Sequence, residues 1–326
     1  MFELLKKRTY SIGIDIDRDS LRLAQLGDNG KGLKLIAGNS QERPGEIKAG
    51  SSTWQKWAIE TIHLLSSYGG FRGKGVVATL PTSDIFIDHI KMPKAENGKL
   101  EDAIFSKIKQ KLPFEPLRQN TMIKYIPAEQ DNVLVLATER KLIDRHLAIY
   151  EEAGLAIKSI CIWPVALANC YTRFFGRRKS DLETIVMLIC VEQNHTNVLI
   201  CRHKNPLFAR TISMGAEQLA DEKVVTRLVL ELNACKRQFG MLYRNSQIER
   251  LIFLSGRSID KNICATIARQ MEMPAQVGDC LAAVQIPNTS RWNSNDECDK
   301  KDLSGPVDRR ESQANWSVAF GLSLSS

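Results

Sequence analysis

The sequence lacks the motifs that hold structural metals or disulfides, and it lacks a long apolar run. Its eight cysteines show no CxxC spacing and several lie inside apolar runs, which is typical of reduced, buried thiols. The five histidines are all separated, and no HExxH segment occurs. The longest apolar runs, such as TIVMLICV at 184–191, are too short to cross a bilayer. We therefore expect a cytoplasmic protein without a metal site, a disulfide framework or a membrane span.

The charge is unbalanced, but motifs for nucleic-acid binding are also lacking. The formal net charge of +8 favours an acidic partner, such as a nucleic acid, an anionic lipid or an acidic protein surface. No stretch interleaves basic with aromatic residues, and the densest basic cluster, RFFGRRKSD at 173–181, is typical of a loop between two halves. We expect no nucleic-acid partner. With 326 residues and 43% apolar content, the chain is long enough for two or more domains.

The most unusual short segment is IGIDIDRDSLRL at 12–23, which places aspartates at every second position. This spacing matches the first ligands of an EF-hand calcium loop, but the glycine and the bidentate glutamate that the loop requires are replaced by Ser20 and Leu26. The flanking residues alternate with the period of strands, whereas an EF-hand lies between helices. The segment is therefore a β-hairpin, with its turn either simply solvated or adapted from a phosphate-binding loop.

The second half of the chain begins like the first. Placing Cys190 on Asp15 superposes CVEQNHTNVLI on DIDRDSLRLAQ, at an offset of 175 residues. A long helix with one apolar stripe follows, and IERLIFLSG then indicates a buried strand that runs into a glycine turn.

A smaller unit interrupts the first half. Residues 84–158 show the order β-α-β-β-α-β, with the last helix N-capped by Thr138, ending at Gly154, and burying Ile143, Leu147 and Tyr150. We therefore expect a first half over 1–83 to which 159–180 return, an inserted module over 84–158, and a second half over 181–326. The polar, turn-rich stretch 287–313 is expected to be a mobile loop.

The order of the segments IGIDIDRDS, LPTSDIFIDHIKMP, VLVLATERKLIDRHLAIYEEAGL, RTISMGAEQL, IERLIFLSG and NWSVAFGLSL resembles the type IV pilus assembly PilM family over nearly the whole chain. The resemblance implies an α/β, actin-like (ribonuclease H-like) fold of two halves, with a small α+β module inserted in the first half, as in the cell-division protein FtsA.

The resemblance also implies where a nucleotide would bind. The candidate positions are Gly13, Asp15, Asp17 and Ser20 in the first hairpin, Thr196 in the second, and Gly256 near the adenosine side. These loops depart from the family pattern. Asp17, Arg18 and Asp19 replace small residues, Cys190 and Glu192 replace Asp and Gly, and Arg257 follows Gly256.

These departures favour loss of nucleotide chemistry. A carboxylate ~4 Å from a phosphate charge costs about 1 kcal/mol in water-like surroundings and about 4 kcal/mol at an effective dielectric near 20. Binding of ATP with magnesium stays possible, because magnesium or Arg18 offsets part of this cost. We assign no catalytic residue. There are two competing interpretations. An actin-like ATPase requires intact phosphate loops, and an FtsA-like filament protein requires a C-terminal amphipathic membrane helix.

The function implied by the resemblance is that of a cytoplasmic adaptor for a pilus or related secretion machine. Such a protein binds the N-terminal tail of a PilN-like inner-membrane protein, contacts other components of the machine and reaches the membrane through its partners. The tail lies in a groove beside the inserted module. Ile87, Ile90, Met92 and Pro93 are the candidate lining residues, although alternating apolar residues of this kind are also typical of a sheet core.

Overall fold

The structure is a computed structural model that describes residues 8–30, 32–92, 100–256, 258–286 and 314–325. The loop expected at 287–313, Pro93 and Arg257 lie outside the described residues.

Two five-stranded sheets with equivalent strand orders form the body of the protein. In each sheet an antiparallel hairpin and a third strand are followed by two parallel strands. The first sheet has the order β3 (Leu33–Glu42), β2 (Ser20–Asp28), β1 (Arg8–Ile16), β4 (Gly75–Thr79) and β8 (Ala156–Cys161). The second has the order β11 (Asn205–Ile212), β10 (Thr196–Arg202), β9 (Ile185–Val191), β12 (Arg250–Phe253) and β13 (Ala275–Val277). The 175-residue repeat in the sequence is thus a structural repeat.

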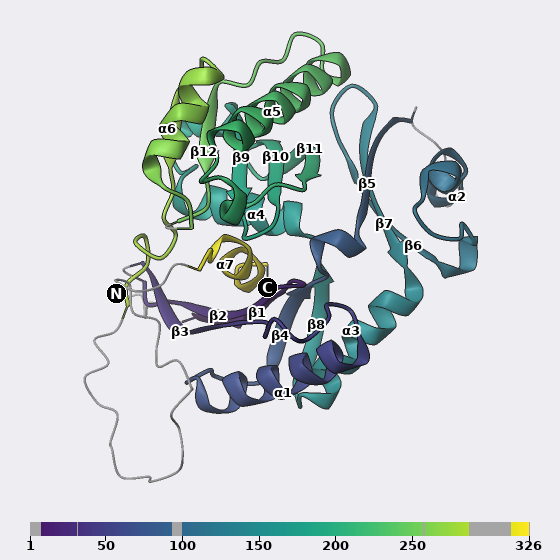
Figure 1. Cartoon of the computed structure of the whole chain (residues 1–326), viewed down its shortest axis with the longest axis vertical. Coiled ribbons are helices and arrows are strands. Elements are labelled where there is room, and N and C mark those ends of the chain that lie inside the picture. The colour runs from purple at the N-terminus through teal and green to yellow at the C-terminus, as the bar shows by residue number, and fades with distance from the viewer. Residues whose placement is uncertain (1–7, 31, 93–99, 257, 287–313, 326) are drawn as a thin grey trace, which may run out of the picture.

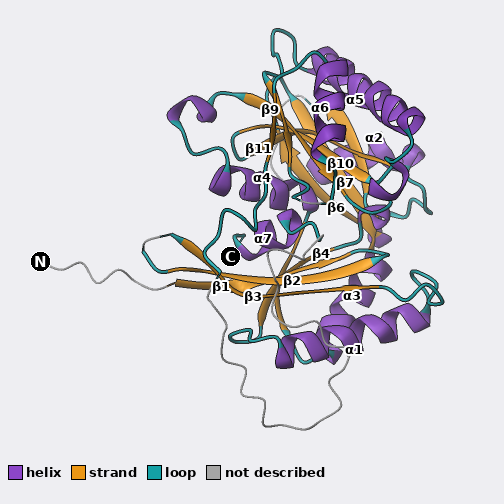
Figure 2. Cartoon of the chain, turned by 60° about the vertical axis from the view of Figure 1, so that its left-hand side comes forward, coloured by secondary structure: helices purple, strands orange, loops and turns teal. Residues whose placement is uncertain are grey.

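Helices cover both faces of each sheet, which gives the molecule five layers (Figures 1 and 2). The outer helices of the first sheet are α1 (Ser52–Tyr68) and α3 (Arg140–Glu152), and those of the second are α5 (Glu222–Leu242) and α6 (Lys261–Gln270). Between the sheets lie α4 (Trp163–Phe174) and α7 (Ser317–Ser323). Because both faces are covered, strands such as β9 are buried at every position and appear in the sequence as continuous apolar runs.

The two inner helices are exchanged between the halves. Helix α4 follows the first half but packs on β10 and β11, and α7 ends the second half but packs on β1 and β2. Helix α4, from the segment expected to return to the first half, thus covers the second sheet, and α7, from the expected second half, covers the first. Their apolar residues face both sheets, so sequence order does not determine which sheet each one covers.

The inserted module is smaller than the sequence predicts. It consists of β5 (Phe86–Lys91), α2 (Leu100–Ile108), β6 (Thr121–Pro127) and β7 (Asn132–Glu139), with the strand order β5-β7-β6. The last helix and strand of the predicted 84–158 unit belong to the first half, because β8 pairs in parallel with β4 and α3 packs against α1. Figure 1 shows the module at the right of the body.

Several local predictions differ from the structure by a few residues. Thr138 still lies in β7, where its hydroxyl donates to the carbonyl of Asp84, and Glu139 takes the N-cap position of α3. The buried face of α3 is His146, Ile149 and Tyr150. Five short 3₁₀ turns complete the described elements: η1 (Thr82–Asp84), η2 (Lys109–Lys111), η3 (Arg118–Asn120), η4 (Lys179–Leu182) and η5 (Ala216–Gln218).

Two glycines allow the inner helices to pack closely. A Cβ atom on Gly13 of β1 would lie 2.1 Å from the carbonyl oxygen of Ala319 in α7. A Cβ atom on Gly321 of α7 would lie 1.9 Å from the carbonyl oxygen of Ala166 in α4. Backbone atoms are the obstacle in both places, so the neighbouring helix would have to move.

We predict that Gly13→Ala destabilises the protein by about 3 kcal/mol or more, because α7 must shift off the first sheet. The matched control is Gly45→Ala, where an added Cβ meets nothing within 4 Å, and its effect is expected to stay within about 0.5 kcal/mol. Urea unfolding followed by circular dichroism measures both. Equal stability of the two variants would show that α7 does not lie this close to β1.

Candidate functional site

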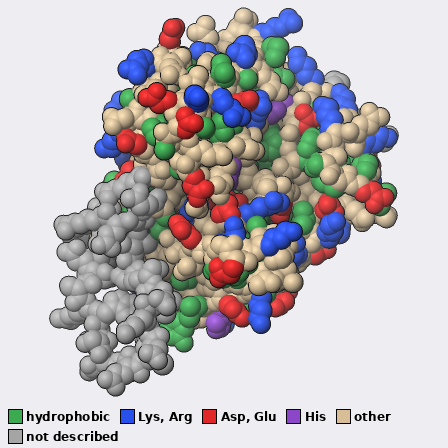
Figure 3. All heavy atoms as spheres, in the orientation of Figure 1, with side chains coloured by type: hydrophobic (Ala, Val, Ile, Leu, Met, Phe, Trp, Pro, Cys, Tyr) green, Lys and Arg blue, Asp and Glu red, His purple; other side chains and the backbone are tan. Residues whose placement is uncertain are grey.

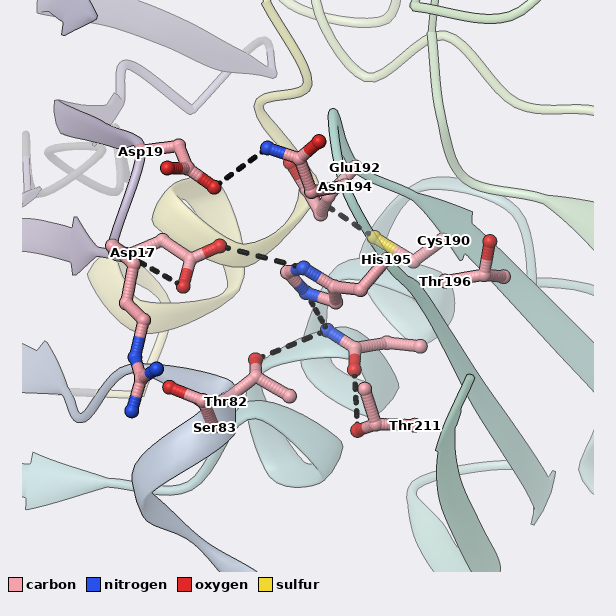
Figure 4. A network of polar contacts seen from close by, with 12 residues as sticks. Asp17, Asp19, Thr82, Ser83, Cys190, Glu192, Asn194, His195, Thr196 and Thr211 are labelled. Atoms are coloured by element: carbon pink, nitrogen blue, oxygen red, sulfur yellow. Dashed lines mark hydrogen bonds and ion pairs between the residues drawn. The ribbon is translucent and has the colours of Figure 1, made fainter. Parts of the chain in front are cut away.

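The turns of the two equivalent hairpins face each other across the cleft between the halves (Figure 4). Asn194 Nδ2 donates to Asp19 Oδ2 at 2.7 Å, and these two residues are equivalent in the 175-residue repeat. His195 Nδ1 lies 3.6 Å from Asp17 Oδ2. The first turn is also held from its own side, because Arg43 Nη2 donates to Asp19 Oδ1 at 2.7 Å. The turns therefore contact each other directly.

Deeper in the cleft, one guanidinium joins the two halves. Arg22 of β2 lies 3.2 Å from Asp15 Oδ2 through Nη1 and 2.9 Å from Glu192 Oε2 through Nη2. All three side chains are at least nine-tenths buried. Removing one partner from a buried ion pair leaves an uncompensated charge, which costs several kcal/mol. Arg22 therefore links the first and second sheets through contacts that are costly to break.

The charge of this cluster depends on a proton at Asp15. Burial raises the pKa of Asp15 to about 7; Glu192 and Asp17 also raise it, whereas Arg22 lowers it. Two ionised carboxylates against one guanidinium carry a net charge of −1, and one proton makes the cluster neutral. Near neutral pH, the net charge of the cluster therefore lies between −1 and zero.

A third segment completes the cluster from the C-terminal side. Asn315, just before α7, donates from Nδ2 to Glu192 Oε1 at 2.9 Å and to Cys190 Sγ at 3.1 Å. Burial, followed by the nearby Glu192, raises the pKa of Cys190 well above the usual range of a thiol. Cys190 is therefore a neutral, buried thiol.

A further set of hydrogen bonds links the segment after β4 to the second sheet. Asn197 Nδ2 lies 3.3 Å from Thr82 Oγ1 and 3.3 Å from His195 Nε2, and Thr211 Oγ1 donates to Asn197 Oδ1 at 2.9 Å (Figure 4). These contacts extend the cross-cleft network from the hairpin turns to the edge strand β11.

The residues that the sequence suggested for nucleotide binding do not all lie in the same environment. Asp15 and Ser20 lie in the cleft, and Asp17 lies at its edge beside His195. Gly13 packs under α7, and the Thr196 hydroxyl donates to the carbonyl of Met214 at 2.7 Å, so these two positions have structural roles. Gly256, with φ +57°, forms the turn near Asp279 and Asn315.

The residues of the cleft do not fit a magnesium-bound nucleotide. A cavity of about 390 Å³ lies beside Ser20, Arg22 and Glu192. However, Arg22 already engages both buried carboxylates, so they are not available to hold a hydrated metal. One amide of each hairpin turn is also paired within the chain: Asp17 N donates to the carbonyl of Ser20, and Glu192 N to that of His195.

The inserted module also contacts the second half. Gln130 Nε2 donates to the carbonyl of Arg244 at 3.1 Å, and Asn132 Nδ2 donates to that of Leu242 at 3.0 Å. On β5, the His89 ring stacks on Phe208 at 4.3 Å, and its Nε2 accepts from the amide of Ala209. The module therefore bridges the two halves, independently of the cleft.

A large hollow lies where the module and both halves meet (Figure 3). Its volume is about 870 Å³, and its walls come from β5, β11 and the starts of α1 and α3. Asp84 is its central acidic group, with Arg18 at 3.0 Å, Arg145 at 3.7 Å and His146 at 3.9 Å. Burial acts to raise the pKa of Asp84, but the contacts with His146 and Arg18 hold this pKa below its usual range.

A second, mostly apolar groove lies between the module and the body of the first half. Its volume is about 460 Å³. It runs between two edge strands, since β6 ends the module sheet and β8 ends the first sheet. The residues that line it include Met122, Ile123 and Lys124 of β6, Ser159, Ile160 and Cys161 of β8, Ile143 of α3, and Val165 and Asn169 of α4.

The predicted partner-binding residues do not line this groove. Ile90 and Met92 are buried in the module core against Ile104 and Ile108 of α2, so the alternative reading as sheet core describes them correctly. Ile87 lines the large hollow between β5 and β11.

Several residues of the site were missed from the sequence. The alternating pattern around Arg22 indicated a strand with one polar face, yet both faces are covered and Arg22 is buried. A signal was present, because Arg22 lies directly opposite Asp15 in the hairpin register. Asn315 gave no signal, because its contacts with Cys190 and Glu192 span more than 120 residues. His195 also lies in the cleft, 3.6 Å from Asp17 Oδ2.

No group of three or more His, Cys, Asp or Glu side chains is arranged to hold a metal ion in the described part of the chain. Among the helices of that part, none is both long and apolar enough to span a membrane.

Two equivalent sheets, exchanged inner helices and opposed hairpin turns at a central cleft define an actin-like protein. Residues 13–238 match the sequence profile of the family described as type IV pilus assembly protein PilM. The match covers more than half of the chain, so this protein belongs to the PilM family.

Solved structures support the fold. The chain is similar to the structure described as a PilM-PilN type IV pilus biogenesis complex, with 18% identity, a TM-score of 0.76 and coverage of 97% of this chain and 98% of the other. It is also similar to the ethanolamine utilization protein EutJ from Carboxydothermus hydrogenoformans, with 10% identity, a TM-score of 0.50 and coverage of 97% and 90%. No curated protein sequence matches the chain.

We predict a specific pH dependence from Asp15. Its pKa is about 7 in the folded protein and near 3.8 when unfolded, so the folded state binds more protons between these values. The contribution of Asp15 to stability therefore decreases as pH rises from about 4 to about 7, by up to about 1.4 kcal/mol per pH unit. The control is Asp15→Asn, which keeps an oxygen near Arg22 but cannot ionise.

Urea unfolding at pH 5, 6, 7 and 8 tests this prediction. The stability of the native chain relative to Asp15→Asn should decrease with rising pH and level off above pH 8. A constant difference between the two proteins would mean that Asp15 is ionised throughout the range.

Proposed function

We propose that this protein is a cytoplasmic adaptor of a type IV pilus assembly machine, and that it holds the extended N-terminal tail of a PilN-like inner-membrane protein in the groove between β6 and β8. The observation that carries the proposal is the position of that groove between two edge strands. An edge strand offers backbone N–H and C=O groups to an added strand, and apolar pockets beside it select side chains.

The geometry of the groove suits an extended peptide. Three consecutive residues from each edge strand line it, so a peptide would have backbone partners along one or both walls. Its floor is apolar, with Leu136 and Ala137 from β7. The exposed Lys124 adds a positive charge at the rim, which favours a tail that carries an acidic residue.

The similarity to the solved PilM-PilN complex supports the choice of partner. That structure covers nearly all of this chain, including the module and the first half that form the groove. The tail of a membrane protein would also bring this protein to the membrane, as the sequence analysis anticipates.

The cleft supports an adaptor and not an ATPase. In an actin-like ATPase the nucleotide joins the two halves, and its hydrolysis changes their relation. Here Arg22, Asn194 and Asn197 make the cross-cleft contacts with side chains of the chain itself. We propose that these contacts replace the nucleotide and fix the two halves for partner binding.

We predict that a synthetic peptide with the sequence of the cognate PilN-like tail binds with micromolar affinity, about −8 kcal/mol, as measured by fluorescence anisotropy. Met122→Glu on β6 and Ile160→Glu on β8 should each raise Kd at least tenfold, because a carboxylate then faces an apolar channel. Both residues are partly exposed, so the fold should tolerate the change.

The control is Leu230→Glu, a substitution of similar character on the outer surface of α5, where the side chain is 62% exposed. It should leave Kd unchanged. Cys161 provides an independent readout: it lines the groove and is the one cysteine of the described residues that is not buried. In a Cys298→Ser background the peptide should slow maleimide labelling of Cys161. Binding that Met122→Glu and Ile160→Glu do not weaken would place the tail elsewhere.

A separate prediction concerns ATP. Isothermal titration with ATP and magnesium should give no binding in the micromolar range and no turnover, because Arg22 engages both carboxylates and one amide of each hairpin turn is paired within the chain. Magnesium-dependent micromolar binding that is lost in Asp15→Ala would contradict this and restore the ATPase interpretation.

A further inference from the structure

A small basic pocket lies at the end of α4, away from the cleft and the groove. Its volume is about 300 Å³, at the lower end of the range for small-molecule sites. Arg177 and Arg178 follow α4, Arg250 begins β12, and Phe174 and Phe175 form its apolar wall. Arg177 and Arg178 belong to the basic cluster of 173–181, and neither the fold nor the proposed function requires them.

The pocket has a rigid base. Asp181 is 3% exposed and accepts from the backbone amide of Arg178 at 2.8 Å and from Arg250 Nη2 at 2.6 Å. Burial acts to raise the pKa of Asp181, but these bonds hold this pKa below its usual range, so the carboxylate stays ionised. Arg250 also lies 3.4 Å from the hydroxyl of Tyr171. Arg250 is therefore fixed before any ligand arrives.

The aromatic wall is fixed as well. A Cβ atom on Gly278 would lie 2.8 Å from the ring of Phe175, and one on Gly176 would lie 2.8 Å from the ring of Tyr171. Glycine at both positions lets the rings pack closely against the backbone. Phe175 remains partly exposed, so one part of its ring is available to a ligand.

The charges in the pocket do not cancel. Three guanidinium groups face one lining carboxylate, and Asp181 is already paired with Arg250. Within the described residues neither Arg177 nor Arg178 forms an ion pair, whereas the neighbouring Arg173 pairs with Asp28 at 2.9 Å. The pocket therefore has a surplus of two positive charges beside a fixed aromatic ring.

We propose that this pocket binds a phosphate group, with Arg177, Arg178 and Arg250 as the ligands of its oxygens and Phe175 beside the organic part. One planar guanidinium can donate two parallel hydrogen bonds to two oxygens of a phosphate, whereas the ammonium of Lys acts as a point charge. The phosphate belongs either to a free phosphorylated small molecule or to an anionic lipid headgroup. This function is additional to tail binding and uses none of the groove residues.

The test measures binding of the full chain to pyrophosphate and AMP by isothermal titration, and to vesicles of phosphatidylcholine with and without phosphatidylglycerol by sedimentation. The variant Arg177→Gln/Arg178→Gln removes the two unpaired charges and leaves the Arg250–Asp181 pair intact. The control is Arg227→Gln/Arg237→Gln, which removes the same charge from exposed positions on α5.

We expect the pocket variant to weaken binding at least tenfold and the control to change it less than twofold. Binding of pyrophosphate or AMP identifies a free ligand, and binding of phosphatidylglycerol vesicles alone identifies a lipid. Equal weakening by both variants would mean that only net charge matters, and no binding to any probe would remove the pocket as a site. Either result overturns the proposal.

Discussion

The buried guanidinium of Arg22 is the interaction on which the relation of the two halves depends. Each actin-like half has its own sheet and outer helices, and the halves are joined by the inner layer, the module, the cleft and a backbone bridge between Lys34 and Gln285. Arg22 lies at the centre of the cleft with a carboxylate from each half within 3.2 Å. Because the three groups are buried, their attraction is screened far less than that of a surface pair.

Much of the fold was predictable because its signals are local. The repeat of 175 residues, the apolar stripe of α5 and the strand alternation indicated two equivalent halves with an insertion between them. The boundary of the module was not predictable in the same way. The sequence of β8 suits an edge strand of the module sheet as well as one of the first sheet. Its pairing with β4 joins segments about 80 residues apart, so local patterns do not reveal it.

The site was less predictable than the fold for a related reason. The hairpin register alone places Asp15 opposite Arg22, so half of the central cluster was accessible from sequence. The other half requires the position of Glu192 and Asn315, which only the packed structure brings together. Ile90 and Met92 show the limit of pattern reading, since the same alternation describes a groove wall and a sheet core.

The two sites differ in what they leave available for a partner. In the cleft, Arg22 pairs with both buried carboxylates within the chain, so a magnesium-bound nucleotide that used them would have to displace existing interactions. In the groove, the outer edges of β6 and β8 form no backbone ladder with another described strand, so a peptide would gain backbone hydrogen bonds without displacing any. Since an internal bond that must first be broken reduces the net gain of binding, this difference is an argument for the groove in the proposed function. The module that forms one wall of the groove also bonds to the second half, so the cross-cleft contacts help to keep the two walls of the groove in a fixed relation.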